Sequence, residues 1–384
     1  MSQIEDLIAK HCPNGVDEKL ISDVAELERG KYISKKTAIP GDIPVIAGGR
    51  GPAYWHNEAN RSGELLTVAG SGAYAGFVQY WDSPIFVSDA FSIITNPQVN
   101  TRFLYHWLKN QQDFLHSLKK GSGVAHVYPK DIAKLKIPVP PLEVQEEIVR
   151  ILDSFTNLEA NLQTELEARR QQYKYYRDSL LTLQNLASRL GEENVKLTPL
   201  GEIGAVKMCK RILKNQTAKA GDIPFYKIGT FGKEPNAYID SNIYEKLKKK
   251  YPFPRKGNIL ISASGTIGNT VIYNGEPAYF QDSNIVWLEH DESIVLDKYL
   301  YYVYQMNPWV VPEGGTIKRL YNDIILKTKI PVPPLSEQER IVAILDKFDA
   351  LVNDLSSGLP AEITARRKQY EYYRDRLLTF TPAK

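Results

Sequence analysis

The sequence predicts mixed α/β (α+β) domains joined by long antiparallel coiled-coil helices, built as an internal tandem repeat with pseudo-two-fold symmetry. The repeat is direct: KIPVPPLEVQEEIVRILDSF begins at Lys136, and KIPVPPLSEQERIVAILDKF begins at Lys329 with 15 of 20 letters identical. A second block, ARRQQYKYYRDSLLT from Ala168, returns as ARRKQYEYYRDRLLT from Ala365. A chain of 384 residues is long enough for two or three domains with cores of their own.

The repeated blocks are predicted to be helical. Residues 142–190 contain no Gly or Pro, and their apolar residues recur in steps of three and four, which is typical of a coiled-coil seam. The second copy has the same seam with one further step of four, and Gly358 and Pro360 are expected to bend or interrupt it. Ahead of each helix, the prolines of IPVPP predict a stiff hinge that ends a strand. Ser336 and Glu339 are predicted to form a capping box.

The order of the parts predicts how the helices pair. The second globular part starts at about Val195, at the far end of the first helix, so the second helix can bury its stripe by running back along the first. A 49-residue helix would span roughly 73 Å, which predicts globular parts at opposite ends of a rigid spacer. The expected boundaries are 1–137 (globular), 138–194 (helical), 195–330 (globular) and 331–384 (helical).

The globular parts are predicted to be mixed α/β units with short strands and many loops. Expected strands cover residues 65–69, 73–80 and 85–94 in the first part and 259–263, 270–273 and 285–288 in the second. Helices are expected over residues 101–118 and 298–305, each covering one sheet.

Composition indicates an ordinary soluble globular protein, with 43% hydrophobic residues, 24% charged residues and a net charge of +3. The sequence has no apolar run of the ~18 residues that a membrane span needs, and we expect a cytoplasmic location. Cys12 and Cys209 are far apart, so buried thiols are expected in place of a disulfide or a zinc site.

Motifs for catalysis are missing from the sequence. An amino-methylating methyltransferase needs Asn or Asp before Pro-Pro and an aromatic residue, whereas both Pro-Pro pairs here lie between Val and Leu. GSGAYAG from Gly70 continues into the strand-like FVQYWD, where a dinucleotide fold would need a helix. There is no G-x-x-x-x-G-K-[ST] phosphate loop and no Glu-x-Lys nuclease motif. We therefore expect no catalytic residues, no metal and no cofactor.

Residues 196–260 carry 14 Lys and Arg against 5 Asp and Glu. Five aromatic residues (Tyr226, Tyr238, Tyr244, Tyr251 and Phe253) are interleaved with these charges, a mixture suited to phosphate contact and base stacking. A solvated loop would explain the charges equally well, and a structural role for His126 stays open beside DNA contact. The candidate DNA-contacting residues are Lys35, Lys36, Arg50, Tyr54, Ser71, Tyr74, Lys119, Lys120, His126, Lys210, Arg211, Lys227, Lys248, Lys249, Lys250, Arg255, Ser264, Thr266, Lys318 and Arg319.

The order of variable domain, IPVPPLxxQ helix, variable domain and IPVPPLxEQ helix with RRxQYxYYRD resembles the specificity subunits of type I restriction-modification enzymes. The resemblance covers essentially the whole chain. It implies that each variable part reads one half of a split double-stranded DNA target. It also implies that the helices set the spacing and dock two methyltransferase subunits, and that separate restriction subunits supply translocation and cleavage. The docking motif of the family maps onto Gln145, Glu146, Arg169, Arg170, Tyr173, Tyr176, Arg177, Gln338, Glu339, Arg366, Arg367, Tyr370, Tyr373 and Arg374.

Two other classes remain open from the residues alone. A self-contained DNA methyltransferase or nuclease would transfer methyl groups or cut DNA as an isolated chain. A protein-protein scaffold would not be retained on duplex DNA at moderate salt.

Overall fold

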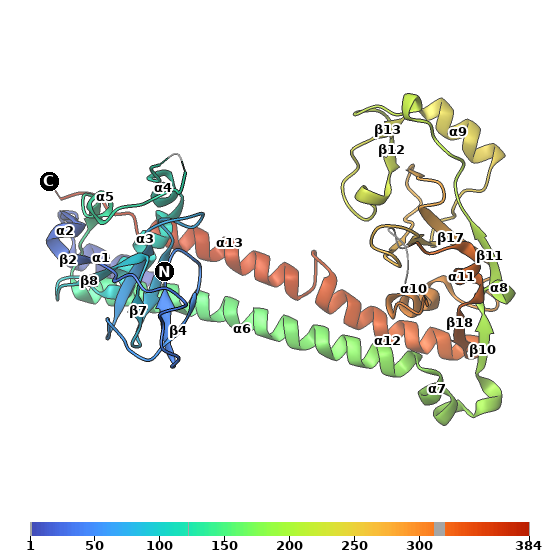
Figure 1. Cartoon of the computed structure of the whole chain (residues 1–384), viewed down its shortest axis with the longest axis horizontal. Helices are drawn as coiled ribbons and strands as arrows, with labels where there is room; N and C mark the ends of the chain where they lie inside the picture. The colour runs from blue at the N-terminus through green and yellow to red at the C-terminus, as the bar shows by residue number, and fades with distance from the viewer. Residues whose placement is uncertain (1, 122, 311–318, 384) are drawn as a thin grey trace. The chain divides into compact units, whose positions relative to one another are not determined.

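The computed structural model of the chain describes residues 2–121, 123–310 and 319–383 (Figure 1). The chain forms two compact units: unit 1 comprises Met1–Thr164 and Glu362–Lys384, and unit 2 comprises Glu165–Ala361. Each unit holds one mixed α/β domain together with segments of the long helices. The predicted fold class is therefore confirmed.

Unit 1 has two sheets, and the strands of one alternate with those of the other along the chain. The larger has four antiparallel strands in the order β2-β8-β5-β6, spanning Ala25–Arg29, Ala90–Thr95, Leu65–Ala69 and Val78–Trp81. The smaller has the order β4-β3-β7, spanning Tyr54–His56, Ile43–Ile46 and Phe86–Val87, with β3 and β7 parallel. Because β7 runs almost directly into β8, one chain segment joins the two sheets.

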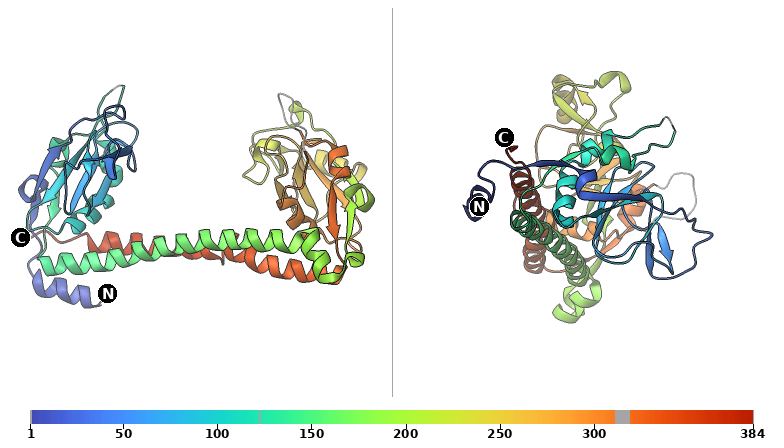
Figure 2. Two further views of the ribbon diagram at one scale, coloured as in Figure 1. Left: turned by 60° about the horizontal axis from the view of Figure 1, so that its bottom comes forward. Right: turned by 90° about the vertical axis from the view of Figure 1, so that its left-hand side faces the viewer.

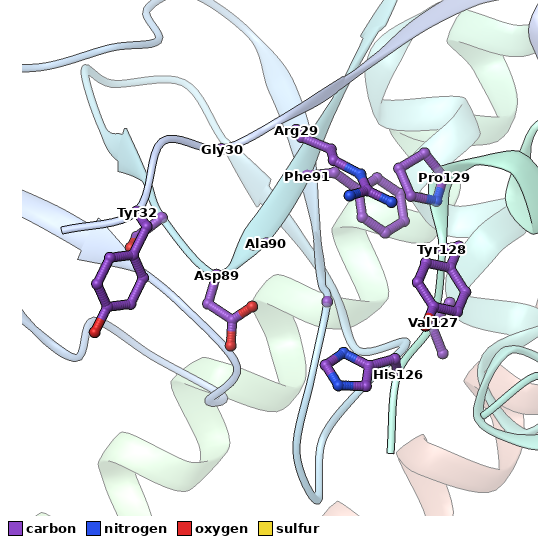
Figure 3. Close-up of a pocket in the computed structure, with 12 residues that line it drawn as sticks. Arg29, Gly30, Tyr32, Asp89, Ala90, Phe91, His126, Val127, Tyr128 and Pro129 are labelled. Atoms are coloured by element: carbon purple, nitrogen blue, oxygen red, sulfur yellow. The ribbon is translucent and has the colours of Figure 1, made fainter. Parts of the chain in front are cut away.

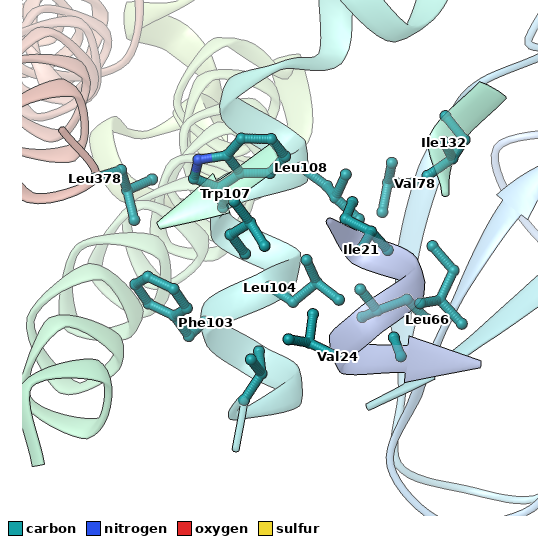
Figure 4. Close-up of a cluster of buried hydrophobic side chains, with 14 of the residues drawn as sticks. Ile21, Val24, Leu66, Val78, Phe103, Leu104, Trp107, Leu108, Ile132 and Leu378 are labelled. Carbon is teal, nitrogen blue, oxygen red and sulfur yellow. The ribbon is translucent and has the colours of Figure 1, made fainter. Parts of the chain in front are cut away.

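Helix α3 (Thr101–Asn110) supplies much of the core of unit 1 (Figure 4). It starts at Asn100, whose side chain accepts hydrogen bonds from two backbone N–H groups of the first turn. Phe103 and Leu104 on its buried face are fully enclosed. They belong to one apolar cluster with Leu66 of the sheet and with Leu378, which follows the last helix of the chain. The C-terminal segment is thus part of the core of unit 1.

Unit 2 repeats the two-sheet arrangement. Its larger sheet has the order β11-β17-β14-β15, spanning Gly204–Lys207, Ile285–His290, Ile259–Ser262 and Thr270–Ile272. Its smaller sheet has the order β13-β12-β16, spanning Tyr238–Ile239, Ile223–Tyr226 and Tyr279–Phe280. Helix α10 (Asp297–Gln305) takes the place of α3, and α9 (Ser241–Lys250) lies between β13 and β14 in the chain.

Short elements complete both units. Each domain is closed by a two-stranded pair ahead of a long helix: β1 with β9 (Glu18–Leu20, Lys136–Pro138) and β10 with β18 (Lys196–Pro199, Lys329–Val332). The remaining short helices are α1 Ser2–His11, α2 Ile21–Val24, α4 Gln112–Ser117, α5 Pro129–Ile132, α8 Leu200–Ile203, α11 Asn322–Lys327 and the 3-10 turns η1 Glu192–Asn194, η2 Lys214–Gln216 and η3 Ile228–Thr230.

The long helices are α6 (Leu142–Leu181), α7 (Leu183–Leu190), α12 (Leu335–Asn353) and α13 (Leu359–Leu377). The prediction of one helix over residues 142–190 is wrong at its end, because Thr182 has an extended backbone that separates α6 from α7. The predicted interruption near Gly358 is confirmed. A Cβ at Gly358 would lie 2.4 Å from the carbonyl oxygen of Ala350, so this turn accepts only glycine.

The helices pair antiparallel within each unit, as predicted (Figure 2). In unit 1, the Phe155 ring of α6 stacks on Tyr373 with centroids 5.4 Å apart, and further along α6 Glu159 pairs with Arg367, which lies earlier in α13. In unit 2, Tyr176 of α6 stacks on Phe348 of α12 at 5.4 Å. Aromatic stacking and ion pairs thus hold these helices together.

The predicted capping box of the second helix is wrong. Helix α12 begins at Leu335 with Pro334 at the N-cap and no side-chain cap, so Ser336 already lies in the first turn. Its hydroxyl is therefore two positions past the N-cap, where a side chain would accept from the free N–H groups of the first turn.

Three predicted elements are shorter than expected. The strand at residues 73–80 begins only at Val78, because Gly72 and Gly76 have left-handed backbone that forms a turn. The strand at 85–94 is split at Ser88 and Asp89 into β7 and β8. The helix at 101–118 is split at Gln111, where α3 ends.

The cysteines differ in environment. Cys209 is buried as predicted, and this burial raises the pKa of its thiol to about 12. Cys12 is only half-buried, so the prediction fails for this residue. Across the described ranges, no helix is long and apolar enough to cross a membrane.

Candidate DNA and partner interfaces

Loops from distant parts of the sequence converge in unit 1, and we call them the unit 1 loop cluster: residues 47–53, 70–77, 119–121 and 123–128. Ser71 forms an antiparallel β-bridge with His126. The close approach of the first loop to Ser71 requires glycine at residue 48, since a Cβ there would lie 2.6 Å from the Ser71 carbonyl oxygen. These backbone contacts bring together residues 55 positions apart in the chain.

Besides Ser71 and His126, four candidate residues lie in this cluster. The Arg50 guanidinium is 4.7 Å from the centroid of the Tyr74 ring, and both side chains are exposed. Lys119 donates to the Ala73 carbonyl at 2.8 Å, and Lys120 pairs with Asp131 at 2.8 Å. The cluster is therefore a basic, partly aromatic surface, which suits contact with phosphates and sugars.

The neighbouring segment of residues 31–42 carries the exposed Lys35 and Lys36. Tyr54, a further candidate, is half-buried and donates its hydroxyl to the Ile33 carbonyl at 2.5 Å. This bond ties the lysine-bearing segment to β4, so the visible role of Tyr54 is to position that segment.

A pocket of about 240 Å³ opens beside the unit 1 loop cluster (Figure 3). Arg29 and Tyr32 line it from the end of β2, Asp89 from the β7–β8 break, and His126 and Tyr128 from the cluster itself. Asp89 was not among the residues that the sequence singled out. The only sequence signal is a polar residue interrupting an otherwise apolar strand.

Unit 2 builds a corresponding set of loops around Ser264. Ser264 forms an antiparallel β-bridge with Arg319, and the Arg319 guanidinium donates to the Ser283 carbonyl at 2.7 Å. Thr266 is exposed in the turn after β14. Lys318, also a candidate, lies outside the described residues.

Helix α9 presents the densest positive charge of unit 2. Lys248, Lys249 and Lys250 form its last turn, and all three are exposed. Lys248 is also bound inward, because its ammonium donates to the Tyr244 hydroxyl at 3.1 Å and lies 5.3 Å from the Phe253 ring centroid. Lys249 and Lys250 are thus the residues of this turn best placed to meet phosphates.

Of the aromatic residues interleaved with these lysines, Tyr244 is buried and cannot stack on a base, which corrects the prediction for that residue. Tyr244 is only 3% exposed and belongs to the core of unit 2. Phe253 packs edge-on against Tyr244, and Tyr226 stacks on Phe280. Within α9, Tyr244 thus lies on the buried face of the helix, whereas Lys249 and Lys250 lie on its solvated face.

The other basic candidates of unit 2 are scattered. Arg211 is exposed and pairs with Asp282 at 3.0 Å. Lys210 and Arg255 are exposed, whereas Lys227 is half-buried at the start of the η3 turn. These residues add positive charge to unit 2.

Gln145 and Gln338 are fully buried, so the expectation that they dock a partner is wrong. The Gln145 amide donates to the Pro140 and Gln98 carbonyls at 2.7 and 3.0 Å and accepts from the Asn100 N–H at 2.8 Å. Both donors and the acceptor oxygen of the side chain are thus bound inside the domain. The signature glutamine is therefore an internal clamp.

Gln338 repeats the same three bonds in unit 2. It donates to the Pro333 carbonyl at 2.9 Å and to the Ile294 carbonyl at 3.0 Å, and it accepts from the Leu296 N–H at 2.9 Å. The neighbouring Glu146 and Glu339 are exposed and stay available to a partner.

A second clamp joins each long helix to its domain. Asp153 of α6 accepts from Arg102 at 3.0 Å and lies 2.8 Å from the His106 ring nitrogen, both on α3. Burial alone would raise the pKa of Asp153, but the hydrogen bonds from His106 and Arg102 lower it overall. In unit 2, Asp346 of α12 is bound in the same way by Lys298 and Tyr302 of α10.

The tyrosines of the repeated RRxQYxYYRD segments divide between the seam and the surface. Tyr173 is buried and donates to Gln305 at 2.9 Å, while Tyr176, Tyr370 and Tyr373 lie in the aromatic contacts of the seam. The burial of Tyr173 contradicts its assignment to docking. Tyr175 and Tyr372, the middle tyrosines of the two segments, are 68% and 59% exposed.

The arginines of these segments keep one geometry in both units. Arg169 bonds Gln172 and Glu165, and Arg366 bonds Gln369 and Glu362 in the same pattern. Arg177 with Asp178 and Arg374 with Asp375 each form an ion pair at 2.7 Å. Arg170 and Arg367 are exposed.

Two units with the same two-sheet domain, each clamped by a proline-hinged helix, define a protein built from a duplicated specificity domain. The chain belongs to the type I restriction modification DNA specificity family, whose model matches residues 13–168 and 192–365. It is 45% identical over 380 residues to a Haemophilus influenzae protein classed as a type I restriction enzyme specificity subunit, covering 95% of this chain and 96% of that one.

More distant relatives belong to the same class of protein. The EcoR124I/EcoR124II specificity subunit of Escherichia coli is 32% identical over 314 residues, covering 76% of this chain and 75% of its own. The crystal structure of a type I S subunit from M. genitalium has a TM-score of 0.61 at 18% identity, covering 94% of this chain and 96% of its own. A chain from a structural study of type I system assembly has a TM-score of 0.57 at 19% identity, covering 95% and 98%. These structures show the shared fold.

Proposed function

We propose that each globular domain of this chain reads one half of a bipartite double-stranded DNA target, and that the paired helices set the distance between the half-sites. The observation that carries the proposal is the duplicated loop architecture, in which Ser71 bridges His126 and Ser264 bridges Arg319. Basic residues surround both bridges, so phosphate contacts can position the loops while other side chains read base edges.

The helices are proposed to dock two methyltransferase subunits, one in each unit. Support comes from side chains that recur in both units and are exposed, such as Tyr175 with Tyr372 and Glu146 with Glu339. Exposed tyrosines are typical anchors of protein interfaces. In the full complex, separate restriction subunits would supply translocation and cleavage.

The chain is proposed to be non-catalytic, with methyl transfer performed by the partner. This rests on the absence of methyltransferase, ATPase and nuclease motifs from the sequence. Turnover of S-adenosylmethionine by the purified chain alone would refute it.

The test is to express the chain with the methyltransferase subunit of its own system and map methylated adenines across a genome. A two-part methylated motif is expected. Replacing residues 20–135 by the corresponding segment of another family member should change one half of that motif and leave the other intact. A change in both halves would show that the domains are not independent readers.

A further inference from the structure

Both units hold an Asx side chain in the same way. In unit 1 the Ser71 hydroxyl donates to the Asp89 carboxylate, and in unit 2 the Ser264 hydroxyl donates to the Asn284 side-chain oxygen at 2.8 Å. The serines are 193 residues apart, which is the offset of the repeated helix start. The two side chains have the same shape and differ in one group, a carboxylate oxygen against an amide nitrogen.

The backbone around the pair is also the same. The Gly70 N–H donates to the Asp89 carbonyl at 3.2 Å, and the Ala263 N–H donates to the Asn284 carbonyl at 2.7 Å. Asp89 and Asn284 thus occupy one structural position, at the entry to the strand beside the serine strand. Because backbone hydrogen bonds already hold this entry, the side chains are not needed to form it.

A third residue completes the arrangement in each unit. His126 lies across the bridge from Ser71, with its ring stacked 6.0 Å from Tyr128. Arg319 lies across the bridge from Ser264, with its guanidinium 5.9 Å from the Tyr321 ring. Figure 3 shows Asp89 and His126 projecting toward the same pocket in unit 1.

The chemistry of Asp89 points to a base edge. Its side chain is exposed, and within the described residues its one side-chain partner is Ser71, so its other carboxylate oxygen is open to the pocket. A carboxylate repels phosphates, yet this one borders a cluster of lysines and arginines suited to phosphates. The groups of duplex DNA that a carboxylate can accept from in the major groove are the amino groups of cytosine and adenine.

We propose that Asp89 and Asn284 are equivalent specificity-determining residues, one for each half-site. Asp89 accepts from the exocyclic amino group of a cytosine or adenine. Asn284 has both an acceptor and a donor, so it binds a base edge that presents an amino group beside an acceptor nitrogen, which is the pattern of adenine. The inference rests on the proposed function, because it assigns the atoms with which each domain reads its half-site.

The test uses Asp89→Asn and Asn284→Asp, which exchange the two chemistries without changing side-chain shape. Each full-length variant is combined with the methyltransferase subunit, and bound duplexes are selected from a library randomised over both half-sites. Asp82→Asn is the matched control, since Asp82 is exposed and does not line the pocket. Melting temperatures establish that each variant is folded.

Asp89→Asn should change the preferred base at one position of the first half-site, with roughly tenfold or greater loss of discrimination, and leave the second half-site unchanged. Asn284→Asp should do the reverse, and Asp82→Asn should alter neither. If wild type selects a two-part site and both folded variants select that same site, this inference is overturned and the proposed function stands. If the wild-type chain selects no two-part site, both this inference and the proposed function are refuted.

Discussion

The Gln145 amide donates to the carbonyl of Pro140 at 2.7 Å, and so ties the first turn of α6 to the proline hinge that precedes it. The same amide group reaches the loop before α3, which makes the hinge, the helix and the domain one body. Gln338 repeats the arrangement in unit 2. The most recognisable polar residue of the repeated motif therefore acts on the position of the helix relative to its own domain.

Replacing Gln145 by Leu should destabilise unit 1 by about 3 kcal/mol, because the buried Pro140 carbonyl would be left unpaired and the part-buried Asn100 N–H and Gln98 carbonyl would lose their partner. Denaturant unfolding would measure the loss. Glu146→Ala, one residue further on and exposed, should change the free energy of unfolding by less than about 0.5 kcal/mol. If Gln145→Leu were as stable as wild type but did not bind the partner, Gln145 would be part of the docking surface after all.

Replacing Tyr175 and Tyr372 by Ala should weaken methyltransferase binding by roughly tenfold or more at each unit, because both rings are exposed and free to enter a partner pocket. Titration calorimetry should show one weakened site for each single variant and two for the double variant. Lys174→Ala, an exposed neighbour, serves as control. Unchanged affinity and stoichiometry in the double variant would exclude these tyrosines from the interface.

The Asp153 clamp predicts a loss of stability in acid. The pKa of Asp153 is lowered in the folded state, so its contribution is present above the unfolded value of about 3.9 and is lost as the pH falls through the folded value. At pH 7, Asp153→Asn should be about 1 kcal/mol less stable than wild type, and this difference should shrink as the pH falls below about 3.9. A difference that stays constant between pH 7 and pH 3 would contradict an electrostatic clamp.

Lys249→Ala should lower affinity for all duplexes alike and reduce the slope of log affinity against log salt by about one, as expected for one lost phosphate contact. The bound half-site sequences should not change. Lys327→Ala, at an exposed lysine in α11 and away from the loops around Ser264, is the control. A variant with altered base preference and an unchanged salt slope would show that Lys249 reads bases.

Inserting four good helix formers after Leu166 should lengthen α6 by about 6 Å, with a rotation of roughly 40°. B-DNA rises ~3.4 Å and turns by a similar angle per base pair, so the preferred spacer should grow by about one base pair. Sites whose spacers differ by single base pairs, tested with the methyltransferase partner, would measure it. Substituting the same four residue types without insertion should leave the optimum unchanged. If a folded insertion variant kept the wild-type spacer length, the helices would not set the spacing and would serve only as docking surfaces.

The sequence by itself determined the features that depend on neighbours in the chain. The letter-for-letter repeat established two equivalent units, and steps of three and four predicted the helices and their seam, because helical packing has a local period. The break at Gly358 was predictable for the same reason, since glycine and proline act on the backbone where they stand.

Only the tertiary structure decided which polar and aromatic side chains face outward. Gln145 and Tyr173 belong to the repeated motif that was expected to face a partner, yet both are buried by segments far away in the chain. Asp89 lies 18 residues from Ser71, and its one local signal, a polar residue in an apolar stretch, does not connect it to Ser71. Strand pairing and domain packing bring such residues together, and because these contacts join distant parts of the chain, no periodicity in the sequence encodes them.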